Sequence, residues 1–359
     1  MVRAGGLLLV GQLLLAHGSA GTTGGGEVHH HRGGGLTSDV MASIISRLPP
    51  VTPPTSGVRD GDELMRTVRL SGAYLADVPI VLPSYTRLVL DGTMDALPYK
   101  LGWTNASAGP VQNTAAMVSA KNVVMVSVEG GVWSCAKWNS SATTTNTTTV
   151  AAIYFDSTSY SFIRNLKISS CGQYSGGNNS GTFGSTRDKY YKSGNIRVVG
   201  GASNVIENVE SSHSMSRGLW AQTSQLVVSG GSYHHINGDG IDLDSGSSHN
   251  TIHNVSAYMC GRMGIYMEFA ASYNTIVGCK LWGNHFANSG FGSGPRKITR
   301  QHNVMLANVY GPSSYPAGCP VAERPCPSWF PVDDPWLATA SPRGIRFRLN
   351  ADFGLRLAS

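Results

Sequence analysis

The sequence places four acidic residues close together, between positions 239 and 268. Asp239, Asp242 and Asp244 fall in the segment GDGIDLD, and Glu268 follows in the segment IYMEF. Two carboxyl groups about 6.5–9.5 Å apart are the general acid and general base of inverting glycosidases. Carboxylate oxygens are also the ligands that Ca²⁺ prefers. We predict that the four acids are catalytic and require no cofactor, with a Ca²⁺ site on Asp242, Asp244 and Glu268 as the alternative.

Aromatic and basic residues accompany these acids. Aromatic rings stack on sugar rings, and basic groups hydrogen-bond to hydroxyls or pair with uronates. The residues that we expect to bind a substrate are Arg197, Trp220, His234, Arg262, Tyr266 and Lys280. Together with the acids they predict a site for a polysaccharide.

The acids lie inside a repeat that runs from Ala151 to about Asn284. Strand-like segments align there in two apolar columns, at steps of 21–25 residues after one step of 43 that contains an inserted loop. The columns are Ile153, Ile196, Leu219, Ile241 and Ile265, and then Ile163, Ile206, Val227, Ile252 and Ile276. A period of this length without helical segments predicts an all-β fold, a parallel β-helix.

Alternation along the strands predicts which residues face outward. If the first column faces the core, one outward row contains Tyr154, Arg197, Trp220, Asp242 and Tyr266. The next row contains Asp156, Val199, Gln222, Asp244 and Glu268. Asp244 and Glu268 should then be close enough for one of them to keep its proton at neutral pH. A third row, of Asn165, Asn208 and Asn254, predicts stacked amides at a turn.

The two ends of the chain differ from the repeat. Residues 1–20 have the basic start, apolar run and small-residue end of a signal peptide, which predicts a secreted protein. Residues 21–60 are expected to form a Gly/His- and Pro-rich linker, with a capping helix over residues 36–48. The β-helix is expected over residues 61–298, and residues 299–359 are expected to be an irregular tail.

Charge and composition exclude some partners. The net charge is +6, but residues 21–295 hold 18 basic and 17 acidic residues, too balanced for a nucleic-acid-binding surface. No segment has the roughly 20 apolar residues of a membrane span, and we expect a monomer. Sequons at five asparagines predict a glycoprotein. Of six cysteines, only Cys319 and Cys326 are close enough in sequence to suggest a disulfide, and Cys279 is expected in the core.

Three short segments resemble the pectin-lyase-like superfamily of right-handed β-helices. Residues 90–92 (LDG) and 130–133 (GGVW) resemble opening coils of polygalacturonases, and residues 237–244 (NGDGIDLD) resemble their Asn-Thr-Asp-Gly-Ile-Asp signature. The resemblance implies that Asp239 is catalytic. The family's second Asp pair corresponds to residues 261–264 (GRMG), where both acids are missing.

Three functions therefore remain. The resemblance favours a polygalacturonase-like hydrolase of glycans that contain uronic acids, with Asp242, Asp244 or Glu268 in the missing role. A uronate lyase or epimerase would use Arg197, Arg262, Tyr266 or Lys280 instead. The third is a glycan-binding or structural repeat protein without catalysis.

Overall fold

The computed structural model describes twelve stretches of the chain. They are residues 28–37, 65–76, 79–96, 114–135, 149–171, 194–214, 216–236, 238–244, 246–268, 270–284, 287–291 and 302–310. The predicted signal peptide, most of the predicted capping helix, Cys319 and Cys326 lie outside them. Within them no helix is long and apolar enough to cross a membrane.

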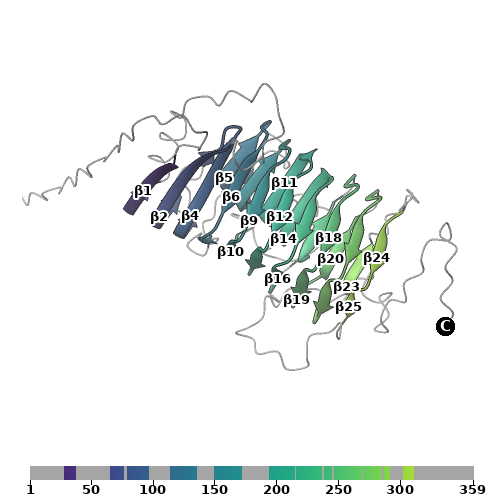
Figure 1. Ribbon diagram of the computed structural model, residues 1–359. Coiled ribbons are helices and arrows are strands. Elements are labelled where there is room, and N and C mark those ends of the chain that lie inside the picture. The colour runs from purple at the N-terminus through teal and green to yellow at the C-terminus, as the bar shows by residue number, and fades with distance from the viewer. Residues whose placement is uncertain are drawn as a thin grey trace, which may run out of the picture.

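Parallel strands stack along one axis, as Figure 1 shows. An eight-stranded sheet contains one strand from each successive coil. Its members are β3 (Ile80–Val81), β5 (Thr114–Lys121), β8 (Thr149–Asp156), β11 (Gly194–Ala202), β14 (Arg217–Ser224), β17 (Ile241–Leu243), β20 (Met263–Met267) and β23 (Ala287–Phe291). Every strand pairs with its neighbour in parallel, so each coil rests on the one before it.

A 17-stranded sheet completes the coils, with two columns of short strands. One column contains β6 (Val126–Glu129), β9 (Phe162–Arg164), β12 (Val205–Glu207), β15 (Val227–Ser229), β18 (Thr251–His253), β21 (Thr275–Val277) and β24 (Val304–Leu306). The other contains β7 (Val132–Ser134), β10 (Lys167–Ser169), β13 (Glu210–Ser212), β16 (Ser232–His234), β19 (Ser256–Tyr258), β22 (Lys280–Trp282) and β25 (Val309–Tyr310). The long strands β1 (Val28–Thr37), β2 (Arg66–Ala76) and β4 (Thr86–Ala96) join the columns at the N-terminal end.

Two boundaries differ from the sequence prediction. Residues 28–37 were expected in a linker, but they form β1, which pairs with β2 along most of its length. Backbone pairing to a preformed edge here outweighs the low strand propensity of glycine. At the other end β24 and β25 extend the solenoid into the predicted tail. Asn274 and Asn303 are equivalent at a step of 29 residues, longer than the 24 of the preceding coils, and this longer step hid the last coil.

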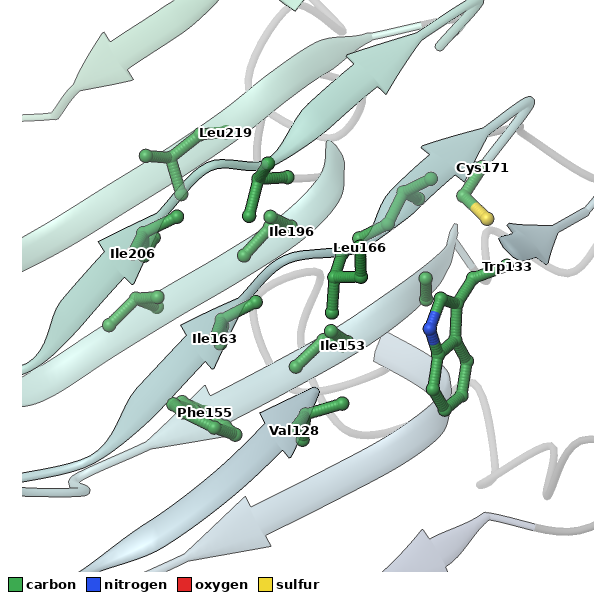
Figure 2. Close-up of a cluster of buried hydrophobic side chains, with 14 of the residues drawn as sticks. Val128, Trp133, Ile153, Phe155, Ile163, Leu166, Cys171, Ile196, Ile206 and Leu219 are labelled. Atoms are coloured by element: carbon green, nitrogen blue, oxygen red, sulfur yellow. The ribbon is translucent and has the colours of Figure 1, made fainter. Parts of the chain in front are cut away.

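The core is the stack of inward side chains from successive coils, and Figure 2 shows the part of it between Val128 and Leu219. The predicted first column is confirmed, because Ile153, Ile196 and Leu219 are fully buried and in register. The second column needs one correction: Ile206 pairs with Val228, and Val227 turns outward. Val227 and Val228 are both apolar, so the sequence pattern could not show which of them faces the core. Cys279 is buried in the core as expected.

Asparagine ladders run along the turns. Asn165, Asn208 and Asn254 all have left-handed backbone conformations, and Asn208 Nδ2 donates to Asn165 Oδ1 over 3.3 Å. A second, buried ladder was not predicted. There Asn274 Oδ1 accepts from the Asn250 amide over 3.0 Å, and Asn303 Oδ1 accepts from the Asn274 amide over 2.8 Å. These amides supply partners for backbone groups that the turns leave without a strand neighbour.

One disulfide joins two coils near the N-terminal end. Cys135 and Cys171 directly follow coils that stack on each other through β7 and β10. No sequence signal indicated this pair, because 36 residues separate the two cysteines. Cys260 and Cys279 are buried free thiols.

Candidate functional site

The outer face of the eight-stranded sheet carries the predicted row of polar and aromatic residues. Tyr154 pairs with Arg197 and Arg197 with Trp220; Trp220 then pairs with Asp242, and Asp242 with Tyr266. Adjacent coils bring these five side chains to one line. The register of the strands therefore assembles a site from residues that are more than 100 positions apart in the sequence.

Much of this outer row is excluded from solvent. Arg197 is 1% exposed, and Trp220 and Asp242 are 0% exposed. The Arg197 guanidinium lies between two rings, 4.9 Å from the centroid of Tyr154 and 4.8 Å from that of Trp220. Burial lowers the pKa of Arg197, and the neighbouring Tyr154, Asp156 and Asp244 oppose that shift. Cation–π contacts strengthen when they are desolvated, so the stack fixes the position of the indole ring.

Asp242 is the buried acid of the cluster. Its Oδ2 accepts from Arg217 Nε over 2.7 Å, whereas Oδ1 has no hydrogen-bond partner among the described residues. Burial raises the pKa of Asp242 to about 7, Arg217 opposes the rise, and the charges of Asp239 and Asp244 add to it. Near neutral pH Asp242 can therefore exchange a proton. Its buried Oδ1 is left to pair with a group beyond the described residues.

Asp239 links two arginines. Its Oδ2 lies 2.9 Å from Arg262 Nη1 and 3.8 Å from Arg217 Nε, and its Oδ1 accepts from the Met263 amide over 3.1 Å. Protein groups thus engage both of its oxygens. These contacts anchor the start of β20 against the preceding coil. Asp239 therefore differs from Asp242, whose Oδ1 has no hydrogen-bond partner among the described residues.

Asp244 and Glu268 form a pair on two adjacent coils. The Asp244 amide donates to Ala221 O and the Glu268 amide to Leu243 O, so the two side chains continue the same row. Burial raises the pKa of Glu268 to about 9, and the charge of Asp242 and a hydrogen bond with Asp244 add to the rise. Glu268 thus keeps its proton at neutral pH.

Tyr266 and Arg262 lie at the more exposed side of the cluster. Both are half-buried, and the Arg262 guanidinium lies 5.1 Å from the centroid of the Tyr266 ring. Burial raises the pKa of Tyr266, so its hydroxyl is protonated and can donate a hydrogen bond. The β20 coil consequently presents Arg262, Tyr266 and Glu268 toward solvent, while Asp242 lies behind them.

Two of the predicted substrate-binding residues lie elsewhere. His234 is on β16 and Lys280 on β22, both in the 17-stranded sheet. The His234 ring stacks on Tyr258 at 4.8 Å, and Tyr258 stacks on Trp282 at 4.4 Å. Burial and the adjacent His235 lower the pKa of His234 to about 4. Basic and aromatic residue types were not enough to distinguish the two outer faces.

Arg217 was missed, although its side chain pairs with two of the acids. It is the first residue of β14 and is 2% exposed. Alternation places Arg217 on the same side as Leu219, and that pattern gave no indication of an outward contact. The signal that was available is its charge, because an arginine on the core side of a strand must pair with a buried acid.

The alternative of a Ca²⁺ site on Asp242, Asp244 and Glu268 stays a prediction. In the described part of the chain no group of three His, Cys, Asp or Glu side chains has the arrangement needed to hold a metal ion. The Arg217 guanidinium also lies 2.7 Å from one oxygen of Asp242. A buried cation at this distance opposes a second cation on the same carboxylate.

Comparison with protein families gives one match. Residues 151–313, a little under half of the 359, match the family described as a right handed beta helix region. This part of the chain is a right-handed β-helix. The resemblance to the pectin-lyase-like superfamily is confirmed at the level of the fold. No curated protein matches the sequence.

Several solved structures are similar to the β-helix at low identity. The enzymatically active domain of bacteriophage CBA120 tailspike protein 2 is 12% identical, with a TM-score of 0.40 over 70% of this chain and 39% of that one. The chain therefore spans about two fifths of the tailspike structure. The periplasmic alginate epimerase AlgG is 11% identical, with a TM-score of 0.30 over 80% of this chain and 85% of the AlgG chain. The A-module of the Azotobacter vinelandii mannuronan C-5 epimerase AlgE6 is 11% identical, with a TM-score of 0.33 over 70% of this chain and 82% of that one.

Proposed function

We propose that this protein hydrolyses glycosidic bonds in a polysaccharide that contains uronic acids, and that it does so outside the cell. The observation that carries the proposal is the pair of raised pKa values on neighbouring coils. Glu268 keeps a proton, whereas Asp242 loses its proton near neutral pH and has one oxygen without a hydrogen-bond partner among the described residues. An acid and a base with separated pKa values are what glycoside hydrolysis requires.

Each acid has a distinct role in the proposed reaction. Glu268 donates its proton to the oxygen of the leaving sugar, and Asp242 takes a proton from the attacking water. Arg217 favours the charged form of Asp242 through its 2.7 Å contact. Asp244 hydrogen-bonds to Glu268 and holds that carboxyl group in place.

The backbone spacing of the β-helix is compatible with an inverting reaction, although it sets the separation of the Cα atoms and not that of the carboxyl groups. Adjacent coils lie about 4.8 Å apart and residues two apart on a strand about 6.6 Å, so the Cα atoms of Asp242 and Glu268 are separated by roughly 8 Å. Inverting enzymes have carboxyl groups about 6.5–9.5 Å apart, which leaves room for a water molecule. Arg262 and Tyr266, on the exposed side, offer a cation and a ring to a uronate.

The test is a panel of polyuronides digested with the wild type, Asp242→Asn and Glu268→Gln. We expect reducing ends from the wild type and a loss of roughly 10²–10⁴-fold in kcat/KM from either variant. The matched control is Asp156→Asn, on the same outer face but outside the cluster, which should retain activity within about two-fold. The kcat/KM profile should be bell-shaped, rising as Asp242 ionises near pH 7 and falling as Glu268 ionises near pH 9.

Other products would point to the other functions. Ultraviolet absorbance from unsaturated sugars would show that the protein is a lyase and not a hydrolase. In that reaction Arg262 would neutralise the uronate. Inverted stereochemistry at C5 without chain cleavage would indicate an epimerase. Retention on a glycan affinity gel without any product would leave a binding protein.

A further inference from the structure

Two buried polar atoms of the site have no hydrogen-bond partner in the described residues: the Trp220 indole nitrogen Nε1 and Asp242 Oδ1. Both side chains are 0% exposed. Folded proteins pair most buried polar atoms, because an unpaired one loses its hydration without compensation. Two such atoms in one site therefore call for a partner beyond the described residues.

The two atoms belong to neighbouring side chains. Trp220 and Asp242 are register partners on β14 and β17, on the same outer face of the sheet. Arg197 packs on the indole ring at 4.8 Å, and Arg217 holds the other oxygen of Asp242 at 2.7 Å. Both side chains are thus held by contacts that do not use the indole N–H or Oδ1.

One atom is a donor and the other an acceptor. Indole Nε1 can only donate, and Oδ1 of an ionised carboxylate can only accept. A single water molecule meets both requirements, because its oxygen accepts from the indole and one of its hydrogens is donated to Oδ1. Two polar partners are the smallest number that holds a buried water in place.

We infer that Trp220 and Asp242 together hold one water molecule, and that this water is the nucleophile of the reaction; the second part rests on the proposed function. The water oxygen forms a bond to the anomeric carbon as the bond to the leaving oxygen breaks. One proton of the water moves to Asp242 Oδ1, and the proton of Glu268 moves to the leaving oxygen. Asp242 then releases its proton to solvent and Glu268 takes up one from solvent, so the net reaction consumes one water.

The variant Trp220→Phe removes the N–H and keeps an aromatic ring beside Arg197. We expect kcat to fall roughly 10- to 100-fold, with KM within about two-fold of the wild type. The acidic limb of the pH profile should move to higher pH, because the Asp242 carboxylate loses a hydrogen bond to the oriented water. The matched control is Trp282→Phe, a similar change in the stacked rings of the 17-stranded sheet, which should leave kcat and the pH profile unchanged.

High-resolution crystal structures of the wild type and Trp220→Phe provide a readout independent of activity. We expect a water within hydrogen-bonding distance of both atoms in the wild type and its loss or displacement in the variant. A wild-type structure without that water would overturn the inference. A variant with raised KM and unchanged kcat would assign the two atoms to a sugar hydroxyl and also overturn it. If the water is present but no glycan is hydrolysed, the water site stands and the proposed function fails.

Discussion

The two outer faces of the β-helix are built from the same coils but differ in how their side chains relate to one another. On the 17-stranded sheet, equivalent positions carry similar residues: His234, Tyr258 and Trp282 stack ring on ring. On the eight-stranded sheet, Trp220 and Asp242 are direct register partners of unlike chemistry. The 17-stranded face thus contains a stack of like rings, whereas the row on the eight-stranded face changes residue type from coil to coil.

The two faces also differ in whether their polar side chains find partners within the protein. On the 17-stranded face polar side chains pair with one another, as where Glu129 lies 2.7 Å from Arg87 and 2.9 Å from Arg164. The changing face instead buries Asp242 and Trp220 with unpaired atoms. Polar groups that are buried at a cost to stability are typical of functional sites. Four experiments test this contrast, in order of expected effect.

The largest effect is expected from Arg217→Met. The variant leaves Asp242 and Asp239 buried without this guanidinium, and loss of one partner of a buried ion pair costs about 3–5 kcal/mol in the free energy of unfolding. The comparison variant is Arg69→Met, whose 2.8 Å pair with Asp91 is exposed and should cost at most about 1 kcal/mol. Urea unfolding measures both, and equal losses would contradict the contrast.

Because Asp242 can take up a proton, the cost of Arg217→Met should be smaller at pH 5 than at pH 8. The double variant Arg217→Met with Asp242→Asn should recover part of the loss, since no carboxylate then remains at position 242.

The second experiment concerns the pH dependence of stability. The pKa of Glu268 is raised to about 9 in the folded protein from the ordinary value of 4.5. Its contribution to stability is therefore complete below pH 4.5 and is lost as the pH rises toward 9. Glu268→Gln cannot ionise, so this decline should flatten, with a gain over the wild type that grows from pH 5 to pH 9.

Unfolding midpoints at pH 5, 7 and 9 measure that gain. Glu207→Gln, half-buried on the outer face of β12, is the control and should keep the pH dependence of the wild type. A parallel decline in the wild type and Glu268→Gln would show that Glu268 does not hold its proton.

The third experiment compares two asparagine ladders. Asn274→Ala removes the acceptor of the Asn250 amide and the donor to Ser247 O, both buried. An unsatisfied buried group costs about 1–3 kcal/mol, and we expect a loss near the middle of that range. Asn208→Ala breaks one exposed bond and should cost a few tenths of a kcal/mol at most. Similar losses for both variants would show that burial does not distinguish the ladders.

The smallest effect is expected from Trp282→Ala. The ring is 36% exposed and stacks on Tyr258, so its removal should cost about 1 kcal/mol. Catalysis should be unaffected, since the stack lies on the 17-stranded sheet. Loss of activity at unchanged stability would assign the rings a role in the reaction and remove the distinction between the faces.

The sequence was sufficient for features that repeat. Inward positions such as Ile196 and Leu219 recur with nearly constant spacing, and their columns specified the register that brought Trp220 beside Asp242. It was not sufficient for features that occur once. Alternation places Arg217 with the core residue Leu219, although its side chain pairs with Asp242. The Cys135–Cys171 disulfide joins two coils across 36 residues of sequence.

The direction of the buried asparagine ladder has a consequence for biosynthesis. Asn250 accepts from the Leu226 amide one coil earlier, and Asn274 in turn accepts from the Asn250 amide. Each turn is thus completed by the coil that follows it in the sequence. A nascent chain, which emerges N-terminus first, cannot close a turn until the next coil has been synthesised. The solenoid should therefore form behind the ribosome with a constant lag of one coil.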